Sequence, residues 1–255
     1  MNILIYKIYN EDCFITMDNI IKENIKINGV LTSPPYNTSR IGRKDKYSTR
    51  YDGFKDNMSD DDYINWTIEL FNKYDKILEK DGCILYNISY SSENTTLMWR
   101  VIYNIIEKTN FSTADCIIWK KKSALPNNVS KNKLTRIVEY IFVFARKNEI
   151  KTFNCNKPVK SINSKTNQKF YENIYNFIEA PNNDGACSLN RSTYSSDLCN
   201  KLLNIYFKEG DIIYDSFMGT GTTAVSCVKN KINYIGSEIS KEQCEYAESR
   251  ISNLN

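Results

Sequence analysis

The sequence predicts an α/β fold in which a mostly parallel sheet carries helices on both faces. The main observation is that apolar segments typical of buried strands alternate with segments of helical spacing through most of the chain. The chain also has 255 residues, of which 41% are hydrophobic, so it can bury a large core. We therefore expect residues 1–255 to form a single domain.

The first half of the chain contains a clear strand, a helix, a second strand and a second helix. Residues 30–32 form a short apolar run that must stop at two prolines. A helix is expected over 60–78, because apolar residues recur at helical spacing behind a Ser-Asp-Asp-Asp capping sequence. The buried-strand pattern of 83–88 follows, and then a helix over 97–106.

Two further strands are expected over 114–119 and 138–145, and the second could pair antiparallel to its neighbours. The stretch 146–192 is rich in Asn, Lys and Ser with weak periodicity, so we expect an insert or long loop that builds no part of the sheet. Within it, 148–190 is the candidate target-recognition insert.

The last part of the chain returns to the strand and helix alternation. A helix is expected over 196–207 and a strand over 211–215. A glycine-rich turn then leads into a helix that starts near Thr222. The strand 233–238 and the helix 241–251 complete the domain.

Composition restricts the chemistry that is open to this chain. Histidine is absent, which excludes His-based acid–base catalysis and His-ligated metals. The eight cysteines are scattered without metal-binding spacing, so we expect reduced thiols and no metal site. The start of the chain is too short and polar for a signal peptide, and no apolar run reaches membrane length, which predicts a cytoplasmic protein. The net charge of +4 fits a polyanion partner or an ordinary soluble protein equally well.

A glycine-rich turn joins a strand to a helix near the C-terminus, with the sequence Asp215-Ser216-Phe217-Met218-Gly219-Thr220-Gly221-Thr222-Thr223. Its glycines allow a ligand to approach the backbone, and the helix start offers free N–H groups. Glu238 follows at the end of the next strand, where an acid can accept hydrogen bonds from a ribose. These features together predict a nucleoside ligand. The turn alone is compatible with NAD, but Asp215 would repel a pyrophosphate and suits an amino-acid ammonium group better.

The segment Thr32-Ser33-Pro34-Pro35-Tyr36 follows the first expected strand. Two successive prolines make a rigid loop with outward carbonyls. Such a loop can hold an acceptor beside an amino group, and Tyr36 offers a flat face for a base. Taken alone, the segment could equally be a strand-ending turn with an incidental tyrosine.

The two motifs together resemble the amino-methyltransferases of DNA, which modify cytosine N4 or adenine N6. Ser33-Pro34-Pro35-Tyr36 matches their catalytic tetrapeptide, and Asp215-x-Phe217-x-Gly219-x-Gly221 matches their cofactor loop. The catalytic motif precedes the cofactor motif, as in the β class. The opening Asn10-Glu11-Asp12-Cys13-Phe14 is similar to the start of the family, which implies that Asp12 and Cys13 lie near the cofactor adenine. The family's Lys-Pro or His-Pro pair is absent from residues 190–195.

The resemblance implies a Rossmann-like methyltransferase fold with a small variable recognition region. It also implies an S-adenosylmethionine-dependent enzyme that methylates the exocyclic amino group of a base flipped out of DNA. The implied cofactor-binding residues are Asp12, Cys13, Thr32, Asp215, Phe217, Gly219, Gly221, Thr222, Thr223 and Glu238.

We expect Ser33 Oγ and the Pro34 carbonyl to accept hydrogen bonds from the target amine and direct its lone pair to the methyl group. Tyr36 would stack on the base. Serine at position 33 favours cytosine N4, since adenine enzymes more often have Asp there; adenine N6 is the alternative. A NAD-dependent oxidoreductase would leave Ser-Pro-Pro-Tyr unexplained. An inactive DNA-binding module would leave the glycine turn and Glu238 unexplained.

Double-stranded DNA is the expected partner. Residues 38–57 directly follow the catalytic motif and mix basic with aromatic residues, so we expect a DNA-contacting loop, although a solvated surface loop has the same composition. The candidate DNA-binding residues are Arg40, Arg43, Lys44, Lys46, Arg50, Lys120 and Lys121. The short variable region favours a homodimer, and the resemblance implies a restriction-modification setting with a cognate restriction endonuclease.

Overall fold

The computed structural model describes residues 4–37, 58–91, 94–124, 126–185, 189–190 and 192–254. The helices are α1 (Cys13–Lys22), α2 (Asp60–Ile77), α3 (Leu97–Lys108), α4 (Ser196–Tyr206), α5 (Thr222–Lys229) and α6 (Lys241–Ser252). The strands are β1 (Lys7–Tyr9), β2 (Ile27–Thr32), β3 (Leu78–Ile88), β4 (Phe111–Lys121), β5 (Val138–Arg146), β6 (Val159–Ile162), β7 (Lys169–Tyr171), β8 (Phe177–Ala180), β9 (Ile212–Asp215) and β10 (Asn233–Ser237).

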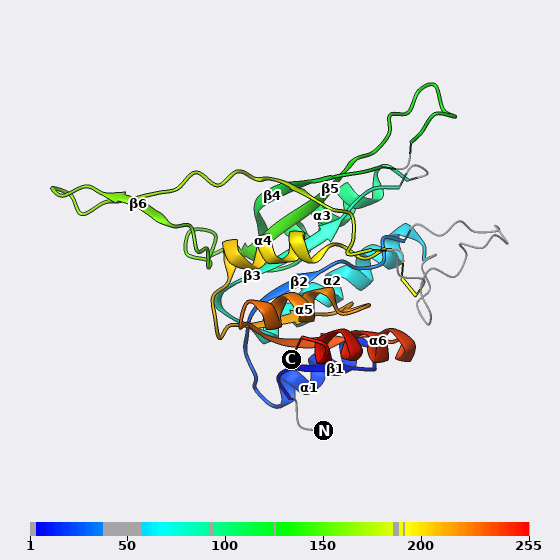
Figure 1. The fold of residues 1–255 in the computed structure, drawn as a ribbon, viewed down its shortest axis with the longest axis horizontal. Helices are drawn as coiled ribbons and strands as arrows, with labels where there is room; N and C mark the ends of the chain where they lie inside the picture. Colours follow the sequence, from blue (N-terminus) through cyan, green and yellow to red (C-terminus); the bar gives the residue numbers. More distant parts are fainter. Residues whose placement is uncertain are drawn as a thin grey trace.

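Eight of the described strands form one sheet, in the order β1-β10-β9-β2-β3-β5-β4-β8 (Figure 1). Neighbouring strands are parallel except at β5, which runs antiparallel to both β3 and β4. The mostly parallel sheet is therefore confirmed, and so is the antiparallel pairing that the sequence left open for residues 138–145.

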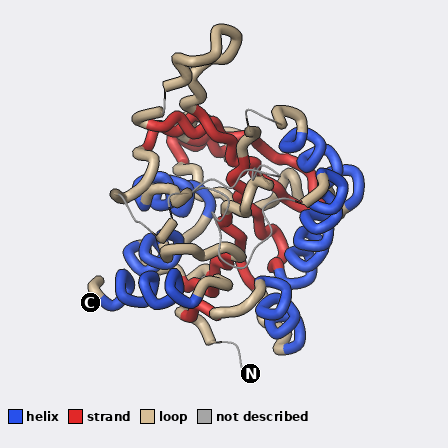
Figure 2. Tube along the Cα trace, turned by 90° about the vertical axis from the view of Figure 1, so that its right-hand side faces the viewer, coloured by secondary structure: helices blue, strands red, loops and turns tan. Residues whose placement is uncertain are grey.

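Helices cover both faces of this sheet, as Figure 2 shows. Helices α1 to α3 pack in one hydrophobic cluster and α4 to α6 in the other. Successive strand residues point to opposite faces, so Val30 and Ile84 join the first cluster while Leu31 and Leu85 join the second. This is why the central strands are continuous apolar runs.

Two parts of the fold differ from the sequence-based expectation. The prediction that 146–192 builds no part of the sheet is wrong, because β8 pairs in parallel with β4. β8 has only four residues, of which Ile178 and Ala180 are buried, so its pattern is too short to stand out. β1 and α1 were not predicted either; β1 spans only three residues and is defined by its pairing with β10.

The remaining two strands, β6 and β7, form a separate antiparallel hairpin within 148–190. Every residue of both strands is exposed, and the hairpin extends well away from the sheet (Figure 1). The recognition role of this insert stays a prediction.

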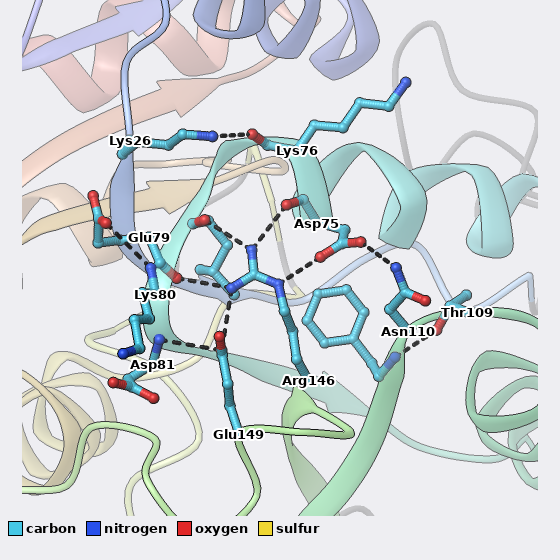
Figure 3. A network of polar contacts seen from close by, with 12 residues as sticks. Lys26, Asp75, Lys76, Glu79, Lys80, Asp81, Thr109, Asn110, Arg146 and Glu149 are labelled. Atoms are coloured by element: carbon cyan, nitrogen blue, oxygen red, sulfur yellow. Dashed lines mark hydrogen bonds and ion pairs between the residues drawn. The ribbon is translucent and has the colours of Figure 1, made fainter.

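Arg146, at the end of β5, is the centre of a hydrogen-bond network at the edge of the sheet where β3 begins (Figure 3). Its guanidinium donates to Asp75 at 2.6 Å, to Glu149 at 3.1 Å and to the Leu78 carbonyl at 2.8 Å. All of these groups are at least half-buried, so the network joins α2, β3 and β5 firmly. The network leaves the opposite edge, where β2 and β9 end, for the candidate site.

Among the helices of the described ranges, none has the length and apolar character that a membrane span requires.

Candidate active site

The two sequence motifs meet at one edge of the sheet. β2 and β9 are parallel neighbours, so their last residues, Thr32 and Asp215, end side by side. The Thr32 hydroxyl donates to Asp215 Oδ1 at 2.7 Å, and both side chains are buried. The carboxyl ends of parallel strands are where open α/β sheets bind ligands. The fold thus brings the Ser-Pro-Pro-Tyr loop and the glycine-rich turn together there.

The Ser-Pro-Pro-Tyr loop is held on its buried side by a hydrogen bond from α2. Pro34 and Pro35 are buried, whereas Ser33 and Tyr36 are only half-buried. Tyr63 of α2 donates its hydroxyl to the Pro35 carbonyl at 2.7 Å. The prolines therefore form the base of the loop, and the two chemically useful side chains lie nearer the surface.

Polar side chains from two other strands surround Ser33 and Tyr36. The Ser33 and Tyr36 hydroxyls are 3.1 Å apart. Asn87, at the end of β3, donates its amide to Ser33 Oγ at 3.3 Å and to the Tyr36 hydroxyl at 2.8 Å. Glu139 of β5 accepts from Tyr36 and from Asn87, each at 3.1 Å. The loop therefore has a fixed hydrogen-bonding environment.

Asp215 is 1% exposed and accepts four hydrogen bonds from within the protein. Its donors are the hydroxyls of Thr32, Thr223 and Tyr194 and the backbone N–H of Phe217. Burial raises the pKa of this carboxyl, and the hydrogen bonds oppose that rise. Asp215 thus supports the glycine-rich turn from inside the protein, and the predicted contact with a ligand ammonium group stays a prediction.

The glycine-rich turn has the backbone conformation that its glycines allow. Gly219 and Gly221 have φ values of 55° and 83°, and Gly221 is the N-cap of α5. A Cβ at Gly221 would lie 2.6 Å from the Cβ of Ala247, so α6 packs directly against the turn. Thr222 and Thr223 begin α5 and are buried.

Glu238 follows β10 and faces the turn from the neighbouring strand. One of its carboxylate oxygens accepts from Gly219 N at 2.8 Å, and the other accepts from Ser240 N at 2.9 Å. Burial raises the pKa of this carboxyl, and these backbone hydrogen bonds lower it. Each oxygen has a further lone pair, which fits the predicted acceptance of ribose hydroxyls.

The other predicted cofactor residues lie on the α1 side of the turn. Phe217 packs on Trp66 of α2, with ring centroids 5.7 Å apart, and Trp66 also contacts Phe14. Asp12 is exposed and caps α1 by accepting from Phe14 N at 2.8 Å. Cys13 is the first residue of α1 and is 4% exposed, so its side chain is buried in the core. Contacts of Asp12 and Cys13 with an adenine stay predictions.

The predicted DNA-binding residues divide into two groups. Arg40, Arg43, Lys44, Lys46 and Arg50 belong to 38–57, which lies outside the described residues. Lys120 pairs with Glu179 at 2.7 Å, and Lys121 pairs with Glu139 while lying 5.0 Å from the centroid of the Trp119 ring. Both lysines thus have acidic partners in the protein.

Four residues of the site were missed by sequence reasoning. Asn87 and Glu139 contact the Ser-Pro-Pro-Tyr loop, and Tyr194 contacts Asp215. Arg250 of α6 donates to the Thr220 carbonyl at 2.7 Å and supports the glycine-rich turn. The only available signal was a polar residue near the end of an apolar strand, as at Asn87, or near its start, as at Glu139.

Comparisons with known proteins agree with this arrangement. A family model for N6 and N4 methyltransferases, described as DNA methylase, matches residues 27–249. Orphan methyltransferase M.BamHII of Bacillus amyloliquefaciens is 27% identical over 269 residues, which cover 91% of this chain and 92% of that protein. Type II methyltransferase M.Cfr9I of Citrobacter freundii is 22% identical over 254 residues, which cover 87% of this chain and 80% of that protein.

Solved structures share the fold. M1.HpyAVI superposes with a TM-score of 0.66 at 22% identity, covering 96% of this chain and 98% of that one. The cytosine-N4-specific PvuII DNA methyltransferase superposes with a TM-score of 0.70 at 17% identity, and the superposition covers 96% of this chain and 85% of that one. The expected Rossmann-like methyltransferase fold is therefore confirmed.

Proposed function

The chain belongs to the N6 and N4 DNA methylase family, and from this premise we propose that it transfers a methyl group from S-adenosylmethionine to cytosine N4 in double-stranded DNA. The observation that carries the methyl-transfer part of this proposal is the Thr32–Asp215 hydrogen bond, which joins the Ser-Pro-Pro-Tyr loop to the glycine-rich turn. Because of this contact, a base held at Ser33 and a cofactor held at Gly219 would be adjacent.

The residues around the glycine-rich turn fit S-adenosylmethionine. The turn offers backbone without side chains at Gly219 and Gly221, and Glu238 offers acceptors for ribose hydroxyls. The adenine would lie near Asp12, which caps α1. When bound, the cofactor would supply an electrophilic methyl group on a sulfonium. The amine nitrogen would form the N–CH₃ bond as the S–CH₃ bond breaks, a neutral thioether would leave with the electron pair of that bond, and the nitrogen would release one proton to solvent.

The Ser-Pro-Pro-Tyr loop supplies the groups that act on the base. The lone pair of an exocyclic amine is conjugated with its ring, so the amine is a weak nucleophile. Hydrogen bonds from its N–H groups to Ser33 Oγ and the Pro34 carbonyl would direct that lone pair out of conjugation and toward the methyl group. Tyr36 would hold the flipped base by stacking, and the enzyme thereby contributes position and electrostatics.

Serine at position 33 favours cytosine N4 over adenine N6. The half-buried Ser33 hydroxyl is neutral and can both donate and accept, whereas the aspartate more common in adenine enzymes is acceptor-only. A ring nitrogen next to the amino group of cytosine can accept a hydrogen bond, but so can that of adenine. The assignment to cytosine therefore rests on the resemblance of the motif.

Nucleoside analysis tests the proposal. The full chain is incubated with labelled S-adenosylmethionine and mixed-sequence duplex DNA, and the digested DNA is examined by mass spectrometry. We expect N4-methylcytosine. N6-methyladenine would move the proposal to the other base, and DNA binding without any transferred methyl group would indicate an inactive DNA-binding module.

A further inference from the structure

A carboxylate to which the sequence assigned no role lies within the Ser-Pro-Pro-Tyr site. Glu139 is the second residue of β5, and its side chain is only 17% exposed. Because β5 runs antiparallel to β3 and β4, its first residues lie at the edge where those strands end. Glu139 therefore lies beside Asn87 and Lys121, at the edge that holds Ser33.

The carboxylate of Glu139 fixes the orientation of Asn87. A carboxylate can only accept, so the amide NH₂ of Asn87 must face Glu139 Oε2, 3.1 Å away. In this orientation Asn87 Oδ1 is buried with no partner in the described part of the chain. The reverse orientation would place Oδ1 against the carboxylate. The charge of Glu139 thus outweighs the cost of leaving that oxygen without a hydrogen bond.

The same carboxylate fixes the proton of Tyr36, whose hydroxyl donates to Oε2 at 3.1 Å. The proton in the 3.1 Å contact between Ser33 and Tyr36 must then come from Ser33. The two N–H groups of Asn87 have three acceptors, of which Tyr36 and Glu139 are nearer, so the 3.3 Å contact with Ser33 Oγ occupies at most one of the two lone pairs of Oγ. The second lone pair is left for a donor on the substrate.

We propose that Glu139 is a positioning residue for methyl transfer: through Tyr36 and Asn87 it holds Ser33 Oγ as an acceptor for the N–H of the target amine. This inference rests on the proposed function. Lys121 supplies the charge that balances Glu139 at the end of β4. The competing explanation is that the Glu139–Lys121 pair only ties β4 to β5, in which case its loss would affect stability but not the reaction.

Steady-state kinetics with Glu139→Gln separate these explanations. The variant keeps the size of the side chain but offers an NH₂ that can face Asn87. We expect kcat to fall by about 10²-fold, as misplaced groups commonly cause, while the KM for S-adenosylmethionine stays unchanged. Tyr36→Phe is a second, milder variant, since it keeps the ring and removes only the hydroxyl that Glu139 orients. It should also lower kcat.

A reciprocal exchange adds a rescue test. Asn87→Asp alone sets two carboxylates against each other and should be nearly inactive. Combined with Glu139→Gln, it restores the hydrogen bond with donor and acceptor exchanged, and the new carboxylate can accept from the Ser33 and Tyr36 hydroxyls, to which Asn87 donates in the wild type. We expect kcat of the double variant to exceed that of either single variant by about tenfold.

Glu149→Gln is the matched control, because Glu149 is also buried and ion-paired but lies at the opposite edge with Arg146 (Figure 3). It should lower the melting temperature and leave kcat unchanged. An unchanged kcat in both Glu139→Gln and Tyr36→Phe, or no gain in the double variant, overturns the inference while wild-type methylation still supports the proposed function. Absence of methyl transfer by the wild type overturns both.

Discussion

Thr32 donates its side-chain hydroxyl to Asp215 at 2.7 Å, across 183 positions of sequence. Both residues end neighbouring parallel strands, and both are almost fully buried. One hydrogen bond therefore links the loop that would hold the base to the turn that would hold the cofactor. We therefore expect a change on one side of this bond to affect the other side.

Thr32→Val keeps the shape of the side chain and removes the donor to Asp215. We expect the free energy of unfolding to fall by about 1–3 kcal/mol, because a buried carboxylate loses a partner. The value of kcat should also fall, since the two loops lose their direct link. Denaturant unfolding and methylation kinetics measure both effects. Thr109→Val is the control: its hydroxyl donates to the Ile105 carbonyl at the end of α3, and only stability should change.

Ser33→Ala removes the proposed acceptor for the target amine. We expect kcat to drop by about 10²–10³-fold, which is typical when a group that stabilises the transition state is lost. The affinity for S-adenosylmethionine should be unchanged, because Ser33 is not one of the residues predicted to hold the cofactor. Isothermal titration with the cofactor and single-turnover methylation separate the two. Equal losses in binding and rate would contradict the assigned role.

Gly221→Ala should damage the glycine-rich turn. Its φ of 83° is unfavourable for alanine, and the new Cβ would lie 2.6 Å from that of Ala247. Gly210→Ala is the matched control, because its φ is 87° but nothing lies within 4 Å of the added Cβ. We expect Gly210→Ala to lose about 1–2 kcal/mol of stability from backbone strain alone. Gly221→Ala should lose more and should also weaken cofactor binding. Similar losses in both variants would mean that the contact with α6 is unimportant.

Glu238→Gln should weaken cofactor binding while leaving chemistry at saturation nearly intact. The carboxylate accepts from two backbone N–H groups, and the amide NH₂ of Gln would face one of them. We expect the dissociation constant for S-adenosylmethionine to rise by about tenfold or more, equivalent to about 1.4 kcal/mol. Equilibrium titration measures this change, and an unaltered affinity would remove Glu238 from the cofactor site.

The raised pKa of Asp215 has a consequence for stability at acidic pH. Because burial disfavours its ionised form, the folded chain binds a proton more tightly at Asp215 than the unfolded chain does. The contribution of Asp215 to stability therefore increases as pH falls from the raised folded value to the ordinary value of 3.8. Asp215→Asn removes this dependence. Unfolding titrations of both proteins should show the wild type gaining stability relative to the variant as pH falls through that window; a constant difference would contradict the assignment.

Local backbone chemistry explains why the two motifs of the site could be predicted from the sequence. Pro34 and Pro35 lack the backbone N–H that a central strand needs, and Gly219 and Gly221 adopt backbone conformations that other residues avoid. Hydrophobic periodicity likewise predicted the strands that end at Thr32 and Asp215, because a strand buried on both faces must be apolar throughout.

The amino-acid sequence alone was thus enough to predict the α/β class, the two motifs, their order along the chain and the family that they resemble. Only the packing of the chain shows which side chains complete the site. Asn87 lies beside Ser33 because β3 pairs in parallel with β2, and Glu139 reaches Tyr36 and Asn87 because β5 pairs antiparallel with β3. Tyr194, which precedes α4, contacts Asp215. Packing also brings β8 into the sheet. The physical reason is the same in each case. Strand pairing and side-chain contacts depend on packing between distant segments, whereas Pro, Gly and apolar periodicity act within a few residues.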